Sequence, residues 1–234
     1  MFTKSAKFYD ALYHFLDYEM ASQKITTIVF NRNPNALSLL DVACGTGKHL
    51  EFLKNHYLLV EGLDINQELL DIAEIRLPDV KFSVGDMIDF KLSKSFDVVT
   101  CLFSSIAYVK SLSNMRKAIS KMSAHLNSGG ILLVEPWISP EQYWERKIIA
   151  NFVDQPDLKI SWMYTHEVDG AVSIFNINYL VGTPEGVTYF TEKHEMGMFT
   201  RTEYEQAFLD AGLTVEYDPV GLFMRGLYIG VKKA

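Results

Sequence analysis

A glycine-rich turn follows the first strongly apolar segment of the chain. Its sequence, Asp41-Val42-Ala43-Cys44-Gly45-Thr46-Gly47, joins a predicted strand to a predicted helix. Glycines let the backbone approach a ligand closely, and the start of a helix offers unpaired N–H groups. A dinucleotide-binding turn would have a third glycine where Leu50 stands, and a phosphate-binding P-loop would have Ser or Thr where His49 stands. The turn therefore predicts a bound ligand that neither of these motifs describes.

Two acidic residues stand where the next two predicted strands end. Asp64 follows the apolar segment 58–63, and its carboxylate can accept hydrogen bonds from both hydroxyls of a ribose. Asp86, in Gly85-Asp86-Met87, follows the segment 80–84 and could contact an adenine amino group. The carboxyl ends of parallel strands form one edge, where open sheets bind their ligands. Together with the glycine-rich turn, these residues predict a nucleoside site.

Apolar strands and amphipathic helices alternate through the first two-thirds of the chain, which predicts a parallel sheet covered on both faces. Asn66 is expected to cap one helix, and Gly129-Gly130 to end the clearest one. That helix has apolar residues at helical spacing, namely Met115, Ala118, Ile119, Met122 and Leu126. The expected strands of the sheet are 37–42, 58–63, 80–84, 96–103, 131–135, 214–217 and 227–231.

The pattern changes after Pro140. Three longer segments, 159–167, 171–181 and 187–199, are separated by hairpin-type turns and predict an antiparallel insertion. We therefore expect residues 1–140 and 200–234 to form a Rossmann-like α/β domain and residues 141–199 to form an inserted antiparallel β region. Thr202 and Glu205 predict a capping box at the start of a final helix that Gly212 ends.

The composition excludes several classes of protein. The 234 residues carry 29 acidic and 22 basic side chains, a net charge of −7, which argues against a general binder of nucleic acid. Two cysteines cannot build a disulfide framework, and the spacing of His and Cys predicts no metal site. The apolar runs are too short to cross a bilayer, and residues 1–10 lack a secretory signal pattern. We expect a cytoplasmic protein that binds neither membrane nor nucleic acid.

The glycine-rich turn, Asp64 and Gly85-Asp86-Met87 together resemble the S-adenosylmethionine site of class I methyltransferases. Further segments are similar to the sugar-nucleotide (dTDP-amino sugar) N,N-dimethyltransferases of desosamine and mycaminose biosynthesis. These segments are Phe8-Tyr9-Asp10, residues 100–106, Val134-Glu135-Pro136-Trp137, Phe199-Thr200-Arg201 and Arg225-Gly226-Leu227. The resemblance covers nearly the whole chain. It implies a class I methyltransferase sheet with helices on both faces, a β insertion that covers the substrate, and methylation of the amine of a nucleotide-linked amino sugar.

The resemblance also assigns roles to single residues. The cofactor would be held by an N-terminal segment that folds over it and by the strand ends, through Tyr9, Tyr18, Ala43, Gly45, Asp64, Ile65, Asp86, Met87, Leu102 and Phe103. The nucleotide-sugar would be bound by Tyr9, Trp162 and Arg225. Apart from the resemblance, Tyr9 and Tyr108 are the candidate catalytic residues, because their rings could stabilise the positive charge as it moves from sulfur to nitrogen.

The chain departs from this family after Ser105-Ile106, where relatives carry a His and this chain carries Tyr108; Ile138 also replaces a second Trp beside Trp137. Tyrosine, with a reference pKa of about 10, is a poor base at neutral pH. A neutral amine needs only to be aimed at an activated methyl group, and positioning alone can supply roughly 7–11 kcal/mol. A hydroxyl must also lose its proton during attack. The departure is therefore easier to reconcile with an N-methyltransferase than with an O-methyltransferase.

Three alternatives stay open at this point. The first is a small-molecule O-methyltransferase, and the second is a regulator that senses the methyl donor without turnover. A nicotinamide dehydrogenase is the third, although Leu50 disfavours it. The exact acceptor, the number of methyl groups added and the oligomeric state are not determined by the sequence. An oligomer is possible because the insertion has strand edges that could pair.

Overall fold

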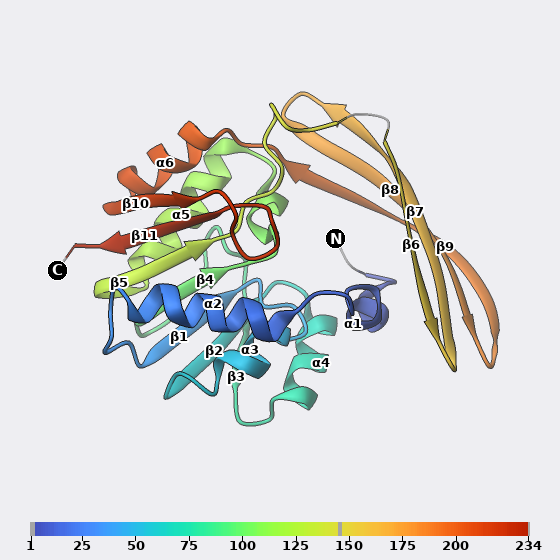
Figure 1. Cartoon of the computed structure of the whole chain (residues 1–234), viewed down its shortest axis with the longest axis horizontal. Coiled ribbons are helices and arrows are strands. Elements are labelled where there is room, and N and C mark those ends of the chain that lie inside the picture. Colours follow the sequence, from blue (N-terminus) through green and yellow to red (C-terminus); the bar gives the residue numbers. More distant parts are fainter. Residues whose placement is uncertain (1–2, 145–146, 234) are drawn as a thin grey trace.

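The computed structural model describes residues 3–144 and 147–233, which form two sheets (Figure 1). The larger sheet has the order β10-β11-β5-β4-β1-β2-β3. Its strands are β1 (Ser38–Val42), β2 (Leu59–Asp64), β3 (Lys81–Val84), β4 (Phe96–Cys101), β5 (Leu126–Val134), β10 (Leu213–Asp218) and β11 (Leu227–Lys232). Strands β1 to β5 pair in parallel, and β11 pairs antiparallel with both β5 and β10. The predicted α/β sheet is confirmed.

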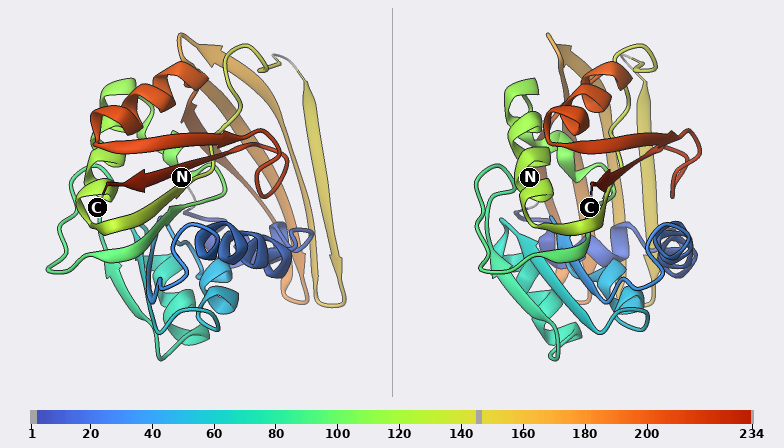
Figure 2. Two further views of the ribbon diagram at one scale, coloured as in Figure 1. Left: turned by 60° about the vertical axis from the view of Figure 1, so that its left-hand side comes forward. Right: turned by 90° about the vertical axis from the view of Figure 1, so that its left-hand side faces the viewer.

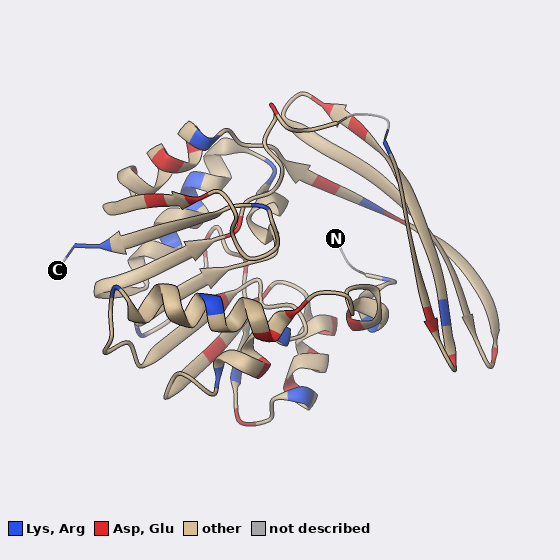
Figure 3. Ribbon diagram, viewed as in Figure 1, with Lys and Arg blue, Asp and Glu red and all other residues tan. Residues whose placement is uncertain are grey.

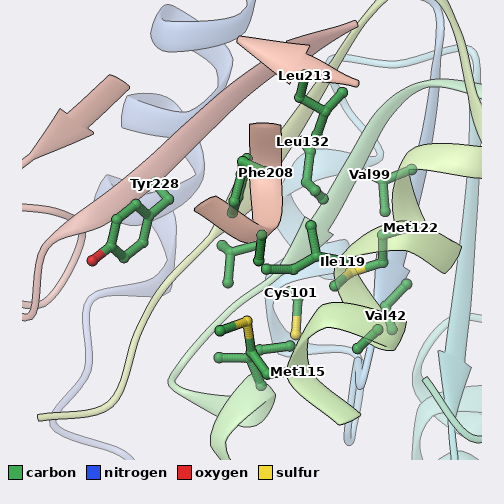
Figure 4. Packing of buried hydrophobic residues seen from close by; sticks show 14 of the residues in the cluster. Val42, Val99, Cys101, Met115, Ile119, Met122, Leu132, Phe208, Leu213 and Tyr228 are labelled. Carbon is green, nitrogen blue, oxygen red and sulfur yellow. The ribbon is translucent and has the colours of Figure 1, made fainter. Parts of the chain in front are cut away.

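Helices cover both faces of this sheet. On one face lie α2 (Tyr18–Phe30), α3 (Lys48–Leu53) and α4 (Gln67–Arg76). On the other lie α5 (Leu112–Ala124) and α6 (Arg201–Asp210), whose apolar side chains pack on β4, β5 and β11 (Figure 4). The Asn66 side chain caps α4, as predicted, by accepting hydrogen bonds from the N–H groups of Glu68 and Leu69. The sequence did not predict helix α2.

The predicted end of the clearest helix is wrong. Helix α5 stops at Ala124, and Leu126 is already the first residue of β5, paired with Phe96. Gly129, with φ of 73°, lies inside β5, where the register slips between Leu126 and Ile131. Leu126 is therefore buried from a strand, although its spacing continues the helical pattern.

The predicted capping box is also wrong, by two residues. Thr200, not Thr202, caps α6: its Oγ1 accepts a hydrogen bond from the N–H of Glu203, and the Glu203 carboxylate accepts one from the N–H of Thr200. Gly212 follows the helix with φ of 78°, as expected of a residue just beyond a helix end.

The smaller sheet has four antiparallel strands in the order β6-β7-β8-β9. They are β6 (Ile148–Gln155), β7 (Leu158–Asp169), β8 (Val172–Thr183) and β9 (Gly186–Gly197). The sequence predicted only three strands, because β6 is an edge strand in which Val153 alone is buried and the apolar residues Ile148 and Phe152 are exposed. The division into two domains stays a prediction.

The smaller sheet stands beside the carboxyl edge of the larger one, and the N-terminal segment lies between them (Figures 1 and 2). That segment contains η1 (Ala6–Phe8) and α1 (Tyr9–Leu12). Leu12 packs with residues of β6 to β9, and β9 contacts η2 (Ser105–Val109), the turn after β4. The space between the sheets is thus lined from both sides. Among the described residues, no helix is long and apolar enough to cross a membrane.

Candidate active site

The predicted ligand-binding residues follow strands at the point where the sheet reverses its order. β1 lies between β2 and β4, and the chain continues to β3 on one side and to β5 on the other. Ligands of open parallel sheets bind at this switch point, beyond the carboxyl ends of the strands. The glycine-rich turn follows β1, Asp64 ends β2, and Phe103 follows β4.

The glycine-rich turn has a backbone conformation that places an open space in front of it. Ala43, Gly45 and Gly47 all have left-handed φ, at 60°, 56° and 74°. A Cβ added to Gly45 would have no atom within 4 Å, because this residue faces a cavity. A Cβ on Gly47 would instead lie 3.3 Å from Leu77. Ala43 adopts its positive φ at some energetic cost, as residues at ligand sites often do.

Asp64 connects the turn after β1 to the turn after β2. Its Oδ2 accepts a hydrogen bond from the N–H of Gly45 at 2.8 Å, and its Oδ1 accepts one from the N–H of Asn66 at 2.8 Å. Burial raises the pKa of Asp64, while the N–H groups of Asn66, Gly45 and Ile65 oppose this rise. Each carboxylate oxygen can accept a second hydrogen bond, so the group is fixed in place and still available to a ligand.

A cavity of about 300 Å³ lies in front of these residues. Several predicted cofactor residues line it, namely Tyr9, Ala43, Gly45, Asp64, Ile65, Asp86 and Met87. Tyr108, a predicted catalytic residue, lines it as well. We call this space the donor cavity.

The other predicted cofactor residues, Tyr18, Leu102 and Phe103, line a small adjoining cavity of about 20 Å³. The two cavities have Tyr9, Ala43 and Ser105 in common. β4 ends two residues earlier than predicted, at Cys101, because the chain turns sharply there: Phe103 has φ of 50°. The early end brings Phe103 to the same edge as the glycine-rich turn.

The N-terminal segment is fixed across the donor cavity by charged and polar contacts. Thr46 Oγ1, in the glycine-rich turn, donates a hydrogen bond to Asp10 Oδ1 at 2.7 Å. Arg76 on α4 forms a salt bridge with the same carboxylate and donates to the carbonyl of Thr46. These contacts hold Tyr9, the neighbour of Asp10, against the donor cavity.

A second cavity, of about 170 Å³, lies between the N-terminal segment and the smaller sheet. It contains all three predicted substrate residues, Tyr9, Trp162 and Arg225. Tyr9, Ser105 and Tyr108 line both this space and the donor cavity. We call it the acceptor cavity, and a molecule in it would lie directly beside a molecule in the donor cavity.

The acceptor cavity has mainly aromatic walls and one guanidinium group. Its aromatic residues are Tyr9, Tyr13, Phe15, Phe103, Tyr108, Trp137, Trp162, Tyr164 and Phe175. The Arg225 guanidinium lies 4.7 Å from the centre of the Phe103 ring and 5.4 Å from that of Trp137, and it donates a hydrogen bond to Ser104 Oγ at 3.1 Å. Trp162 is buried, and its Nε1 has no hydrogen-bond partner among the described residues.

Glu135 organises the loops that carry these groups. Its Oε2 accepts a hydrogen bond from the N–H of Phe103 at 2.6 Å, and its Oε1 accepts one from the N–H of Phe223 at 3.3 Å. Burial raises the pKa of Glu135, and the charge of Arg225 lowers it. One fully buried carboxylate thus fixes the loop after β4 relative to the loop before β11.

Sequence reasoning missed two further groups of residues at the site. Tyr13 stands four residues after Tyr9, one helical turn away, and this spacing could have placed both in the cavity wall. His194 and Glu192 alternate along β9, which could have placed both side chains on one face. Tyr108 lies within hydrogen-bonding distance of His194, 2.8 Å from its Nδ1.

Comparison with known proteins agrees with this geometry. The family model of a methyltransferase domain matches residues 39–130. The chain is 37% identical over 219 residues to the dTDP-3-amino-3,6-dideoxy-alpha-D-glucopyranose N,N-dimethyltransferase of Streptomyces fradiae, covering 93% of this chain and 86% of that protein.

Two solved structures are similar over the whole fold. The structure of DesVI from Streptomyces venezuelae has a TM-score of 0.94 and 35% identity, covering 99% of this chain and 100% of that one. The SAM-bound structure of CalS10, an amino pentose methyltransferase from Micromonospora echinaspora, has a TM-score of 0.89 and 33% identity, covering 100% of this chain and 98% of that one. The chain is therefore an S-adenosylmethionine-dependent methyltransferase and belongs to the family of the dTDP-amino sugar N,N-dimethyltransferases.

Proposed function

We propose that the protein transfers methyl groups from S-adenosylmethionine to the amine of a nucleotide-linked amino sugar. The observation that carries this proposal is the meeting of the donor and acceptor cavities at Tyr9, Ser105 and Tyr108. A relative that covers 93% of this chain is named for N,N-dimethylation of a dTDP-linked amino sugar, and one solved relative for an amino pentose. Both names describe a sugar that carries an amine, and this amine is the proposed methyl acceptor.

The residues of the donor cavity suit S-adenosylmethionine. The buried Asp64 carboxylate keeps acceptor capacity for the two ribose hydroxyls, and Asp86 with Met87 would lie at the adenine. The backbone at Ala43 and Gly45, where a side chain is absent or small, would face the methionine part, beside Tyr18, Leu102 and Phe103. When bound, the cofactor supplies an activated methyl group on a positively charged sulfur.

The residues of the acceptor cavity would bind the nucleotide-sugar and orient its nitrogen. The planar guanidinium of Arg225 can donate two parallel hydrogen bonds to a phosphate, and the orphan Trp162 Nε1–H can donate to an oxygen of the acceptor. Tyr9 and Tyr108 line both cavities, so they would lie where the two reactants meet. Their rings would stabilise the positive charge as it moves from sulfur to nitrogen, by about 0.5–2 kcal/mol for each good contact.

We further propose that the protein acts in the cytoplasm on a small molecule and not on nucleic acid. Cys44 and Cys101 are both free and buried, which suits a reducing compartment. In the described part of the chain, Lys and Arg are scattered among Asp and Glu (Figure 3), whereas a nucleic-acid groove needs them clustered.

The test is an assay with labelled S-adenosylmethionine and a panel of dTDP-linked amino sugars, in which mass spectrometry follows the products. We expect mass increases of one and then two methyl groups on amine-bearing sugars. The matching sugars with a hydroxyl in place of the amine should stay unmodified. Methylation of those hydroxyl sugars, or binding of the cofactor without turnover of any amine, would contradict the proposal.

A further inference from the structure

Three polar side chains, Tyr108, His194 and Glu192, lie in a row that begins where the donor and acceptor cavities meet. Tyr108 lines both cavities, and its hydroxyl lies 2.8 Å from Nδ1 of His194. On the far side of the imidazole, His194 Nε2 lies 3.9 Å from Oε2 of Glu192. His194 and Glu192 are both buried. Tyr108 and His194 both line the acceptor cavity, and Glu192 lies behind the His194 imidazole.

The end of this row is a fixed carboxylate. Glu192 Oε1 accepts hydrogen bonds from the N–H of Thr3 at 2.9 Å and from the N–H of Ser5 at 3.1 Å, and Oε2 accepts one from the Ser5 hydroxyl. Burial would raise the pKa of Glu192, but the nearby His194 imidazole and the hydrogen bonds from Ser5 and Thr3 hold this pKa well below its usual range. Glu192 is therefore ionised at neutral pH.

The carboxylate sets the role of each imidazole nitrogen. A negative charge beside Nε2 favours the tautomer with its proton on Nε2, which leaves Nδ1 as the acceptor of the Tyr108 O–H. Burial lowers the pKa of His194, against the influence of Glu192, so the imidazole is neutral at neutral pH. The imidazolium that forms when it accepts a proton would lie beside the Glu192 carboxylate. Phe175 stacks on its ring at 5.7 Å and keeps it in this orientation.

The other titratable groups around the pair do not compete for that proton. Those that face Tyr108 from the surrounding elements are Tyr9, Tyr13, Tyr164, Tyr179, Glu192 and Arg225. Burial raises the pKa of the tyrosines Tyr9, Tyr13, Tyr164 and Tyr179, so they are neutral at neutral pH. Arg225 carries no basic site for that proton, and its charge lowers the pKa of Tyr108 against the larger effect of burial.

We propose that Tyr108, His194 and Glu192 form a proton relay that deprotonates the acceptor's ammonium group before each methyl transfer. This inference rests on the proposed function, because only an amine acceptor arrives as an ammonium. A Tyr hydroxyl alone is too weak a base, but it can accept a proton while it passes its own to His194. The relay thereby supplies the basicity that the Tyr108 hydroxyl lacks.

Each proton transfer in the relay conserves atoms and charge. An N–H bond of the ammonium breaks and a new O–H bond forms on Tyr108, while the original Tyr108 O–H bond breaks and an N–H bond forms on His194 Nδ1. The nitrogen regains its lone pair, Tyr108 stays neutral, and the imidazolium is paired with the Glu192 carboxylate. The free lone pair then forms the N–C bond as the S–C bond breaks and its electrons stay on sulfur. The methylated nitrogen is again an ammonium, so a second methylation needs a second deprotonation, after His194 has released its proton to water.

The relay predicts a pH-dependent defect in variants of His194. His194→Gln should lower kcat on the order of 10- to 100-fold at about pH 7, at the lower end of the effect of a general base, with little change in the KM of the acceptor. The rate should approach that of the parent as the pH rises and the amine loses its proton in solution. The exposed residue His56 offers a matched control, because His56→Gln should follow the parent at every pH.

A second variant separates proton transfer from a purely structural role. Tyr108→His places an imidazole directly at the reaction point, so activity should persist, and adding His194→Gln to it should cost little further. Tyr108→Phe, which fills the same space without a hydroxyl, should show the same pH-dependent defect as His194→Gln. This pattern would not arise from a loss of folding, which lowers the rate at every pH.

Two results would overturn the relay. The first is a His194→Gln enzyme that matches the parent at about pH 7, and the second is one whose defect is equal at all pH values. In both cases the parent still forms N-methyl product, so the proposed function stands. A parent that forms no N-methyl product at any pH would instead contradict the proposed function, and the relay with it.

Discussion

The Asp64→Asn substitution is the sharpest single test of the donor cavity. The carboxylate already holds the N–H groups of Gly45 and Asn66, and its remaining acceptor capacity is assigned to two ribose hydroxyls. A hydrogen bond to a charged group contributes about 1.5–3 kcal/mol. Asparagine keeps one neutral acceptor oxygen, so we expect one ribose bond to be lost and the other weakened, about 2–4 kcal/mol in all.

This loss corresponds to a roughly 30- to 1000-fold increase in the Kd of the cofactor. Isothermal titration calorimetry with the demethylated cofactor measures it directly. Asp79→Asn, an exposed change of the same chemistry just before β3, should leave the Kd unchanged. The new side-chain amide would also direct its NH₂ group at a backbone N–H, so thermal unfolding without cofactor should show a loss of about 1–3 kcal/mol. A folded Asp64→Asn protein whose Kd stays within about threefold of the parent would refute the placement of the ribose.

Three further predictions address the buried carboxyl, the helix cap and the acceptor cavity. Burial raises the pKa of Asp41 to about 7, so the parent should lose roughly 4 kcal/mol of unfolding free energy between about pH 4 and pH 7. Asp41→Asn should remove this loss. Urea unfolding that gives the same pH profile for the parent and the variant would contradict the prediction. Thr200→Ala should destabilise the protein by about 0.5–2 kcal/mol in thermal unfolding, whereas Thr202→Ala should be nearly neutral, and the reverse order would contradict the observed cap. Arg225→Lys should raise the KM of a nucleotide-linked acceptor about tenfold or more and leave cofactor binding unchanged, and an unaltered KM would exclude a phosphate contact.

The sequence predicted the sheet and the donor edge because both depend on local patterns. Apolar runs mark buried parallel strands wherever they occur, and their order along the chain brings Asp64 beside the turn at Gly45 without knowledge of distant contacts. The errors fall where local patterns compete. Leu126 continues the apolar spacing of helix α5, but it lies in strand β5 and pairs with Phe96. Thr202 and Glu205 have the spacing of a capping box, but the residue that caps α6 is Thr200.

The acceptor side could be predicted only in part, because it is built from long-range contacts. Trp162 and Arg225 line the acceptor cavity through strands and loops far apart in the sequence, and resemblance alone suggested them. The contact between Tyr108 and His194 joins residues 86 positions apart, and no local spacing signals it. Strand β6 was missed because an edge strand buries few side chains, and its apolar residues Ile148 and Phe152 are exposed.

The most direct test of the central claim is the position of the methyl group after one complete reaction. The protein would be incubated with methyl-labelled S-adenosylmethionine and a dTDP-linked amino sugar, and NMR of the product would show which atom carries the label. We predict that every transferred methyl group is bonded to the sugar nitrogen. A label on a sugar oxygen or on the nucleobase, or no transfer by a protein that binds the cofactor, would contradict it.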